Sequence, residues 1–206
     1  MNTKTFLSRA ICAGLFAGLV GSAPLKAQDQ SFRLGAGLSI VSPYGDLADT
    51  ASLGFGLSVF GEVGIAKTMA LRGRVEYALF GEKDLGTFSD WLPSSGIPNS
   101  KVTGSANALV LFADYILRFE SHDSGLYAFA GLGIVNGTFK IKAEATVLGT
   151  NISDTEDLSK SKLGYSAGLG YNISRNLGLE ASLTAASGGD DFVDFNWVRV
   201  SFKYRF

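Results

Sequence analysis

The stretch Phe195–Phe206, F-N-W-V-R-V-S-F-K-Y-R-F, decides the fold, because from Val198 onward its apolar and polar residues alternate without exception. Side chains of a strand point alternately to its two faces, so one face here is apolar and the other is charged or polar. The apolar face carries Val198, Val200, Phe202, Tyr204 and Phe206, and the other carries Arg199, Ser201, Lys203 and Arg205. An exposed edge strand this apolar would aggregate in water. A closed barrel in a membrane satisfies both faces, with lipid outside and the lumen inside.

The composition fits one membrane-embedded domain. The chain has 206 residues, and its net charge of −1 and pI near 5.8 give no reason to expect nucleic-acid binding. Glycine accounts for 26 residues and aromatic residues for 12% of the chain. No uninterrupted apolar run after the N-terminus is long enough for a membrane helix. High apolar content without such a helix is what a membrane β-barrel predicts.

Residues 1–27 have the pattern of a secretory signal peptide: a positively charged start, the apolar run Ala10–Val20 and small residues before a cleavage site. We expect cleavage after Ala27, which leaves residues 28–206 as one barrel domain. Cleavage after Ala23 is less favoured because a proline follows, and a retained anchor helix is disfavoured because the apolar run is too short to span. Cys12 lies inside this segment, so the mature chain would have no cysteine.

Period-two alternation recurs along the chain and predicts eight strands of about ten residues, the length that a tilted strand needs to cross a bilayer. They run from Ser31 to a break at Ser42, over Leu53–Ile65, Met69–Phe80 and Ser105–Phe119, from Leu126 to Asn136, and over Leu163–Ile173, Leu177–Ala185 and Phe195–Phe206.

The connections between these segments alternate in length. Short ones, such as 66–68 and 174–176, follow the second, fourth and sixth strands, and long ones follow the first, third, fifth and seventh. We expect loops at 81–104 and 136–162; within the latter, 138–148 could prolong a hairpin beyond the membrane, whereas 149–161 is polar. Bacterial barrels have short periplasmic turns and longer extracellular loops. The prediction is an all-β, eight-stranded, antiparallel up-and-down transmembrane β-barrel.

Charged residues of both signs fall on the inward parity and predict a charge network in the lumen. They are Arg33, Glu62, Arg72, Arg74, Glu76, Asp114, Arg118, Glu180, Arg199, Lys203 and Arg205. A soluble cup with the opposite facing is the alternative, but it would not explain a charge-free outer face. A Lys or Arg facing lipid at mid-depth costs about 2–4 kcal/mol. Eight strands leave an interior that side chains fill, so we expect a plugged barrel in which inward glycines make room for arginine stems.

With these strands in hand, the chain resembles the small porin-family outer-membrane barrels, OmpA-like and OmpX-like, over residues 28–206. The series Val198, Val200, Phe202, Tyr204 and Phe206 looks like the C-terminal signal by which the insertion machinery recognises this family. The segment Ser42–Leu47, S-P-Y-G-D-L, is similar to the first-loop region of many such barrels, though more weakly. The resemblance implies an outer-membrane location and contacts with outer-membrane lipid. It does not imply an activity.

Several residues resemble parts of catalytic or ligand-binding sites, but for each of them a role without catalysis or ligand binding is favoured. His122, beside Asp123 and Ser124, is expected in a solvated periplasmic turn, not in a hydrolase triad. Glycine pairs such as Gly35 and Gly37 open no helix, so they are no nucleotide fingerprint. The acidic loop residues are too loosely arranged to hold a metal ion. They are Asp154, Glu156 and Asp157 in the third loop and Asp190, Asp191 and Asp194 in the fourth.

Some aromatic and apolar residues depart from the pattern. Phe88, Trp91, Leu92 and Ile97 in the second loop are expected to pack on the barrel rim, with a recognition patch as the alternative. Phe195 and Trp197 have the inward parity, so either a bulge shifts the strand there or both rings cap the lumen.

The sequence favours a structural or surface-interaction role through the extracellular loops, without catalysis, metal or cofactor, by a monomer whose extracellular ligand is unknown. The two loops of about twenty-five residues motivate this hypothesis. A passive narrow channel for small solutes is the first alternative. An outer-leaflet lipid-modifying enzyme is the second.

Overall fold

A computed structural model of the chain describes residues 32–86, 100–119, 124–147, 150–186 and 194–206. The predicted signal peptide, His122 and the four apolar residues of the second loop lie outside the described residues. The elements are β1 (Phe32–Pro43), α2 (Asp46–Thr50), β2 (Ser52–Ala66), β3 (Met69–Gly81), β4 (Lys83–Gly86), β5 (Ser100–Arg118), β6 (Gly125–Val147), β7 (Thr150–Asn172), β8 (Leu177–Ala186) and β9 (Phe195–Arg205). No helix among the described residues is long and apolar enough to cross a membrane.

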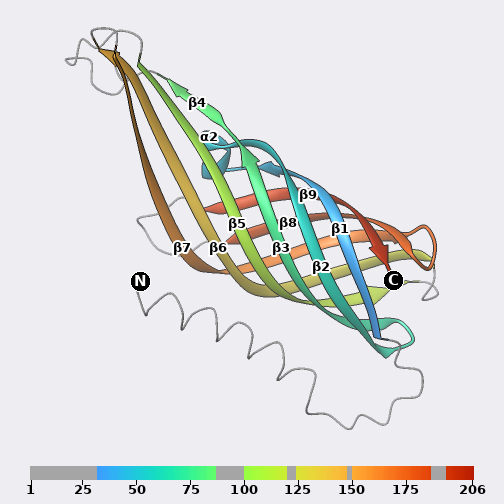
Figure 1. Cartoon of the computed structure of the whole chain (residues 1–206). Helices are drawn as coiled ribbons and strands as arrows, with labels where there is room; N and C mark the ends of the chain where they lie inside the picture. Colours follow the sequence, from blue (N-terminus) through green and yellow to red (C-terminus); the bar gives the residue numbers. More distant parts are fainter. Residues whose placement is uncertain (1–31, 87–99, 120–123, 148–149, 187–193) are drawn as a thin grey trace. The chain divides into compact units, whose positions relative to one another are not determined.

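The strands form one antiparallel sheet that closes on itself (Figure 1). Neighbours along the chain pair with each other, β9 pairs with β1, and β3 pairs with β5, which completes a ring of eight long strands. The pairing of β3 with β5 ends at Asn107 of β5. The short β4 pairs with β5 alone, over Val102–Gly104. The predicted eight-stranded up-and-down barrel is therefore confirmed, with β4 as an unexpected ninth strand.

Connections at one end of the barrel are tight, as predicted. Only two residues separate β2 from β3, and residues 173–176 join β7 to β8. At the first of the long connections, β1 continues to Pro43 and is followed by the single-turn helix α2. Gly45 allows this change of direction, because its φ of 62° is in the left-handed region.

The prediction of a loop at 136–162 is wrong for most of its length. β6 continues to Val147 and β7 begins at Thr150, and the two strands pair without a register shift from Gly125–Asn172 to Val147–Thr150. The predicted prolongation of the hairpin is correct over 138–147, but residues 150–161 are strand and not polar loop. Polar side chains on both faces hide such a strand from a periodicity search, because no face needs to be apolar outside the membrane.

The loop expected at 81–104 is also shorter than predicted. β4 occupies Lys83–Gly86, and β5 already begins at Ser100. Residues 100–104 pair with β6, and Val102–Gly104 pair on their other side with β4. Both corrections extend β5, β6 and β7 in the same direction, past the ends of the other long strands (Figure 1).

The two faces of the barrel wall have opposite character, and the outward face is apolar. Large outward side chains are exposed on every long strand, as Leu38 on β1 (63%) and Leu132 on β6 (65%) show. On β6 the apolar outward positions run from Leu126 to Ile134, and on β7 from Leu163 to Tyr171. These nine-residue spans match the roughly 9–11 residues that cross a bilayer.

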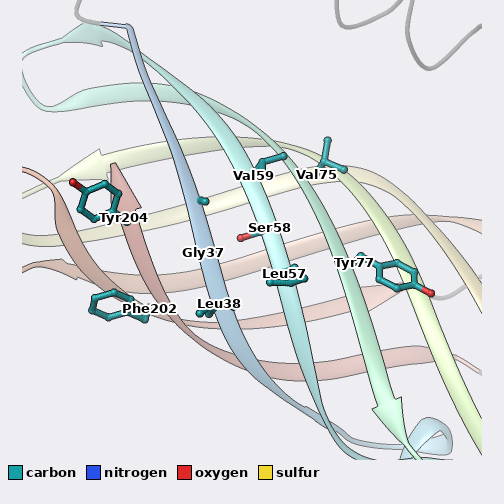
Figure 2. A pocket seen from close by; sticks show the side chains of 10 residues that line it. Gly37, Leu38, Leu57, Ser58, Val59, Val75, Tyr77, Phe202 and Tyr204 are labelled. Atoms are coloured by element: carbon teal, nitrogen blue, oxygen red, sulfur yellow. The ribbon is translucent and has the colours of Figure 1, made fainter. Parts of the chain in front are cut away.

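The outward face also contains two shallow, adjoining hollows between β9, β1, β2 and β3. The first has a volume of about 550 Å³, and Figure 2 shows Leu57, Val59 and Tyr77 along one side and Phe202 and Tyr204 along the other. Its lining is almost wholly apolar and lies within the lipid-facing band. We therefore assign it to the lipid-facing surface.

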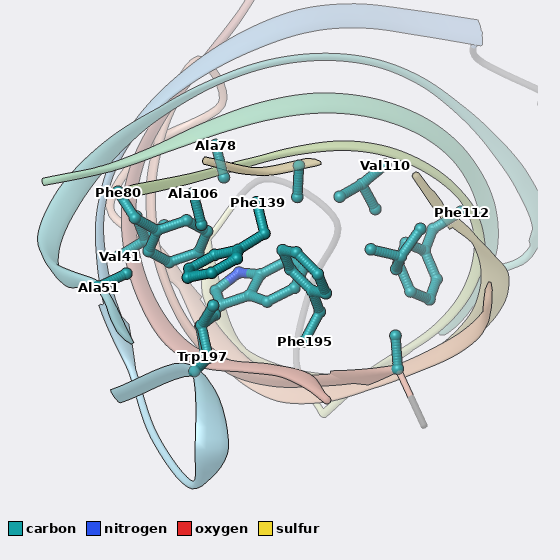
Figure 3. Packing of buried hydrophobic residues seen from close by; sticks show 14 residues of the cluster. Val41, Ala51, Ala78, Phe80, Ala106, Val110, Phe112, Phe139, Phe195 and Trp197 are labelled. Carbon is teal, nitrogen blue, oxygen red and sulfur yellow. The ribbon is translucent and has the colours of Figure 1, made fainter. Parts of the chain in front are cut away.

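An apolar plug fills the lumen at the end that carries the long connections (Figure 3). Trp197 and Phe195 are 0% and 1% exposed, and the Phe80 ring meets Trp197 edge-on at 5.8 Å between centroids. Leu47 brings α2 into the same cluster. The ladders of β9 to β8 and to β1 run without a shift, so both rings cap the lumen and no bulge reverses them.

Candidate functional site

Glu180 is the centre of the charge network in the lumen. It projects from β8 and is 3% exposed. Its carboxylate accepts hydrogen bonds from Lys203 Nζ at 2.7 Å, from Arg199 Nη2 at 3.2 Å, from the Tyr127 hydroxyl at 2.8 Å and from Arg72 Nη1. One carboxylate thus joins side chains from β3, β6, β8 and β9 across the barrel.

Two further carboxylates continue the network around the lumen. Asp114 Oδ2 accepts bonds from Arg72 Nε at 2.9 Å and from Arg74 Nε at 3.1 Å. Glu76 Oε2 accepts a bond from Arg74 Nη1 at 2.5 Å and one from Arg199 Nη1. Each arginine therefore bridges two carboxylates, and hydrogen bonds to charged groups of this kind are the stronger ones.

A separate cluster lies nearer the tight-turn end. Glu62 accepts a bond from Arg118 Nη2, and Arg205 Nε lies 3.7 Å from its other oxygen. Arg205 also donates to Asn172 Oδ1 at 2.8 Å. Arg33, which sequence analysis assigned to the same network, is only half-buried, while the other ten predicted lumen charges are all buried.

Several inward glycines make room for aromatic rings, whereas the expectation was that they make room for arginine stems. A Cβ on Gly35 would lie 2.3 Å from Cζ of Phe60, and one on Gly170 would lie 2.1 Å from Cζ of Tyr127. The Phe60 ring in turn lies under the network, with Lys203 Nζ 4.2 Å from its centroid. These aromatic residues were not predicted to lie in the lumen, although their position in the alternation places them on the inward face.

The side chains of the network are shielded from solvent. Arg72, Arg199 and Glu76 are each 1% exposed, and Glu62 is 2% exposed. The walls of an aqueous pore would be accessible to solvent. These buried charged side chains therefore form a packed core of the barrel, and their ion pairs connect strands across the lumen.

The predicted insertion signal lies on the outward face of β9. Phe202 and Tyr204 are 46% and 45% exposed, and Phe206 is 76% exposed with its ring edge-on to Tyr204 at 5.4 Å. β9 pairs with β1 and β8, so these side chains stand beside the strand pair that unites the two ends of the barrel sequence. Their role in insertion stays a prediction.

Beyond the apolar band the outward face of β6 and β7 turns polar. Asn136 Nδ2 donates to Ser161 Oγ at 2.8 Å, directly above the lipid-facing pair Ile134 and Leu163. Further along, Lys140 Nζ lies 3.5 Å from Asp157 Oδ2. Next to this ion pair, Lys142 Nζ lies 2.6 Å from Glu144 Oε1. This hydrogen bond lowers the pKa of the Glu144 carboxyl. The membrane boundary therefore falls between residues 134 and 136 of β6.

The acidic residues considered as metal ligands are dispersed in the part of the chain that the structure describes. Asp154, Glu156 and Asp157 are strand residues of β7. Asp194 Oδ1 accepts a bond from Lys162 Nζ at 3.0 Å, and sequence analysis missed that buried lysine. No group of three or more His, Cys, Asp or Glu able to hold a metal is found among the described residues. Asp190 and Asp191 lie outside them.

Comparison with known proteins agrees with this geometry. Residues 12–206 match the model of the outer membrane protein beta-barrel domain family. The chain belongs to this family. Membership implies an outer-membrane location. None of the curated proteins compared with the chain matches it.

The chain is similar to several solved structures at low sequence identity. A major outer membrane protein from Thermus thermophilus is 16% identical, with 85% of this chain and 100% of that chain covered and a TM-score of 0.52. The N-terminal β-barrel domain of Pseudomonas aeruginosa OprF is 13% identical, with 86% and 100% covered and a TM-score of 0.49. Yersinia pestis Ail, an attachment invasion locus protein, is 19% identical, with 86% and 97% covered and a TM-score of 0.47.

Proposed function

We propose that this barrel acts at the cell surface as a structural and interaction protein, without catalysis, through the sheet that β5, β6 and β7 build beyond the membrane. The observation that carries the proposal is the length of the β6–β7 hairpin. Beyond the membrane boundary each strand has twelve residues, 136–147 in β6 and 150–161 in β7. That is about 40 Å of strand.

The projecting sheet has a surface that is accessible to binding partners. Residues 153–161 of β7 are all exposed, and Leu158 is an exposed apolar residue (47%) among them. Its base is fixed by the packed lumen, because Phe139 of β6 belongs to the apolar plug. A rigid scaffold that positions an exposed segment is a common arrangement for binding.

The filled lumen counts against the alternative of a passive channel. The plug at one end and the ion network below it consist of side chains with almost no solvent exposure. A solute would have to displace both. We therefore expect no conductance steps from purified protein in planar bilayers.

The test removes the projecting part of the hairpin. Residues 141–156 are replaced by a two-residue Asn-Gly turn, which suits a short β-hairpin and keeps Phe139 in the plug. The variant is displayed on cells lacking the wild-type protein. Adherence is counted on immobilised extracellular proteins and on other cells. We expect adherence to fall at least tenfold, while heat-modifiable gel migration shows an intact barrel.

A matched control shortens no strand but replaces Lys142 and Glu144 by Gln, which removes one exposed ion pair. This control should adhere like the wild type. Wild-type adherence by the shortened, folded barrel would contradict the proposed function.

A further inference from the structure

A shallow furrow runs along the lipid-facing side of β1. Ala36 is the smallest outward residue of this strand within the apolar band, and it is half-buried between Tyr204 on β9 and Val59 on β2. The hollow of about 550 Å³ over Ala36 adjoins the second hollow, of about 640 Å³, which continues along β1 to Ile40. Together the two hollows form one furrow, flanked by the larger side chains of β9 and β2 (Figure 2).

The width and length of the furrow decide what can lie in it. β9 and β2 pair with β1 on its two sides, so the flanking side chains stand on strands about 10 Å apart. An α-helix with its side chains is about 10–12 Å across, and the wall of a second barrel is convex, so neither fits along the floor. A single extended acyl chain is much thinner. From Ala36 to Ile40 the furrow is about 13 Å long, close to half of the hydrocarbon core of about 30 Å.

The furrow is apolar and belongs to the surface that contacts lipid. None of the described residues that line its two hollows is charged. The furrow is continuous with the exposed apolar side chains of the barrel wall, and membership of the outer-membrane family places this wall in a membrane. Whatever fills the furrow therefore comes from the bilayer. Lipid tails are as apolar as leucine, so a chain is held here by close packing with the walls and not by the hydrophobic effect.

One end of the furrow lies towards the tight turns of the barrel, which are periplasmic in bacterial barrels. Tyr204 lines this end, two residues before the C-terminus, and it is 45% exposed. A tyrosine side chain combines an apolar ring with a hydroxyl that can donate a hydrogen bond. Tyr204 can therefore contact an acyl chain with its ring and the ester group of the same lipid with its hydroxyl.

We infer that the furrow holds one acyl chain of a phospholipid from the periplasmic leaflet, and that the Tyr204 hydroxyl donates to its ester carbonyl. The bound chain covers the outward face of β1 where this strand pairs with β9, the pairing that closes the barrel. The site is separate from the proposed surface role, because the furrow lies within the membrane and the projecting sheet lies outside it. Failure of either leaves the other standing.

The test uses the full chain in nanodiscs of phosphatidylcholine, with a small fraction of a phosphatidylcholine that carries a photoreactive diazirine in the middle of one acyl chain. This lipid has no net charge, so labelling reports packing and not charge attraction. Labelled peptides are located by mass spectrometry after illumination. We expect the furrow walls on β2 and β9 to be labelled at least about threefold more than the lipid-facing segment 126–134 of β6. Equal labelling of all lipid-facing strands would indicate ordinary surrounding lipid and overturn the inference.

Filling the furrow supplies the decisive comparison. Ala36→Leu should lower labelling of the β2 and β9 walls at least about threefold, and Ala36→Val, a smaller change, should lower it less. Ala128→Leu makes the same exchange at another half-buried, lipid-facing alanine, on β6, and should leave this labelling unchanged. Each variant is first checked for an intact barrel by heat-modifiable migration. Equal labelling of the walls in Ala36→Leu and Ala128→Leu contradicts the assignment of the chain to this furrow.

Two tyrosine variants test the hydrogen bond to the ester. Tyr204→Phe should lower the labelling at least about twofold, whereas Tyr171→Phe removes a lipid-facing hydroxyl near the same end of β7 and should leave it unchanged. Equal effects would overturn the bond assigned to Tyr204. A second copy of the chain is the competing occupant. A dimer that native mass spectrometry detects and that Ala36→Leu abolishes would assign the furrow to that copy and refute the lipid site.

Discussion

Replacing Glu180 by Gln should destabilise the barrel more than any single change of charge on its surface. The carboxylate serves three buried cations, Arg72, Arg199 and Lys203, and accepts the Tyr127 hydroxyl. Removing one partner of a buried ion pair costs about 3–5 kcal/mol, because a buried charge is left uncompensated. Since three cations share this carboxylate, we expect a loss of about 4–5 kcal/mol in the free energy of unfolding.

The three cations do not depend on Glu180 equally. Arg72 retains Asp114, and Arg199 retains Glu76. Lys203 has no other carboxylate within salt-bridge distance among the described residues, and it also lies over the rings of Phe60 and Tyr127. Adding Lys203→Met to Glu180→Gln should therefore recover about 1–3 kcal/mol.

The assay is urea unfolding of the protein in lipid vesicles, followed by tryptophan fluorescence and by heat-modifiable migration. Glu156→Gln, on the exposed hairpin, is the matched control and should change stability by less than about 0.5 kcal/mol. The reasoning is refuted if Glu180→Gln stays within about 1 kcal/mol of the wild type. It is also refuted if the second substitution lowers stability further.

Three other substitutions test separate parts of the structure. Leu132→Arg, on the lipid-facing side of β6, should lower the free energy of unfolding by about 2–4 kcal/mol in the same assay. Leu158→Arg, beyond the membrane, should lower it by less than about 0.5 kcal/mol. Equal losses would contradict the position of the membrane boundary. Trp197→Ala should cost about 3–5 kcal/mol by leaving a cavity in the plug, and Trp197→Phe should cost clearly less. Both are followed by heat-modifiable migration, because they remove a fluorescent reporter, and a neutral Trp197→Ala would show that the plug does not stabilise the barrel. Phe206→Ser should lower the amount of protein recovered in the outer membrane without changing the stability of purified barrel; unchanged recovery would contradict its role in insertion.

The sequence was sufficient for the barrel wall because one physical constraint acts on every wall residue. Lipid outside and ions inside impose a period of two, and the register of β9 shows it at each position from Val198 to Arg205. The same parity identified the inward charges. It could not identify their partners, since Arg72 and Glu180 are 108 residues apart and meet only because the sheet closes.

The outer half of β7 was missed for the opposite reason. Beyond Asn136 and Ser161 neither face meets lipid, so residues such as Asp154 and Thr155 carry no alternation to read. Their strand conformation comes from pairing with β6 and not from a buried face. The same holds at the start of β5, where Lys101 and Thr103 are strand residues outside the band.

The continuous β6–β7 ladder therefore runs from the barrel in the membrane into the sheet outside it. For this reason the stability of the barrel is linked to the position of the exposed hairpin. β6 contributes Tyr127 to the ion network, Phe139 to the plug and Lys140 to the projecting sheet, all in a single unshifted register. Weakening the lumen would loosen the base from which the hairpin projects, whereas changing Glu156 or Leu158 would leave the base intact. Substitutions in the lumen should thus affect stability and surface binding together, and substitutions in the exposed outer half of β7 should affect binding alone.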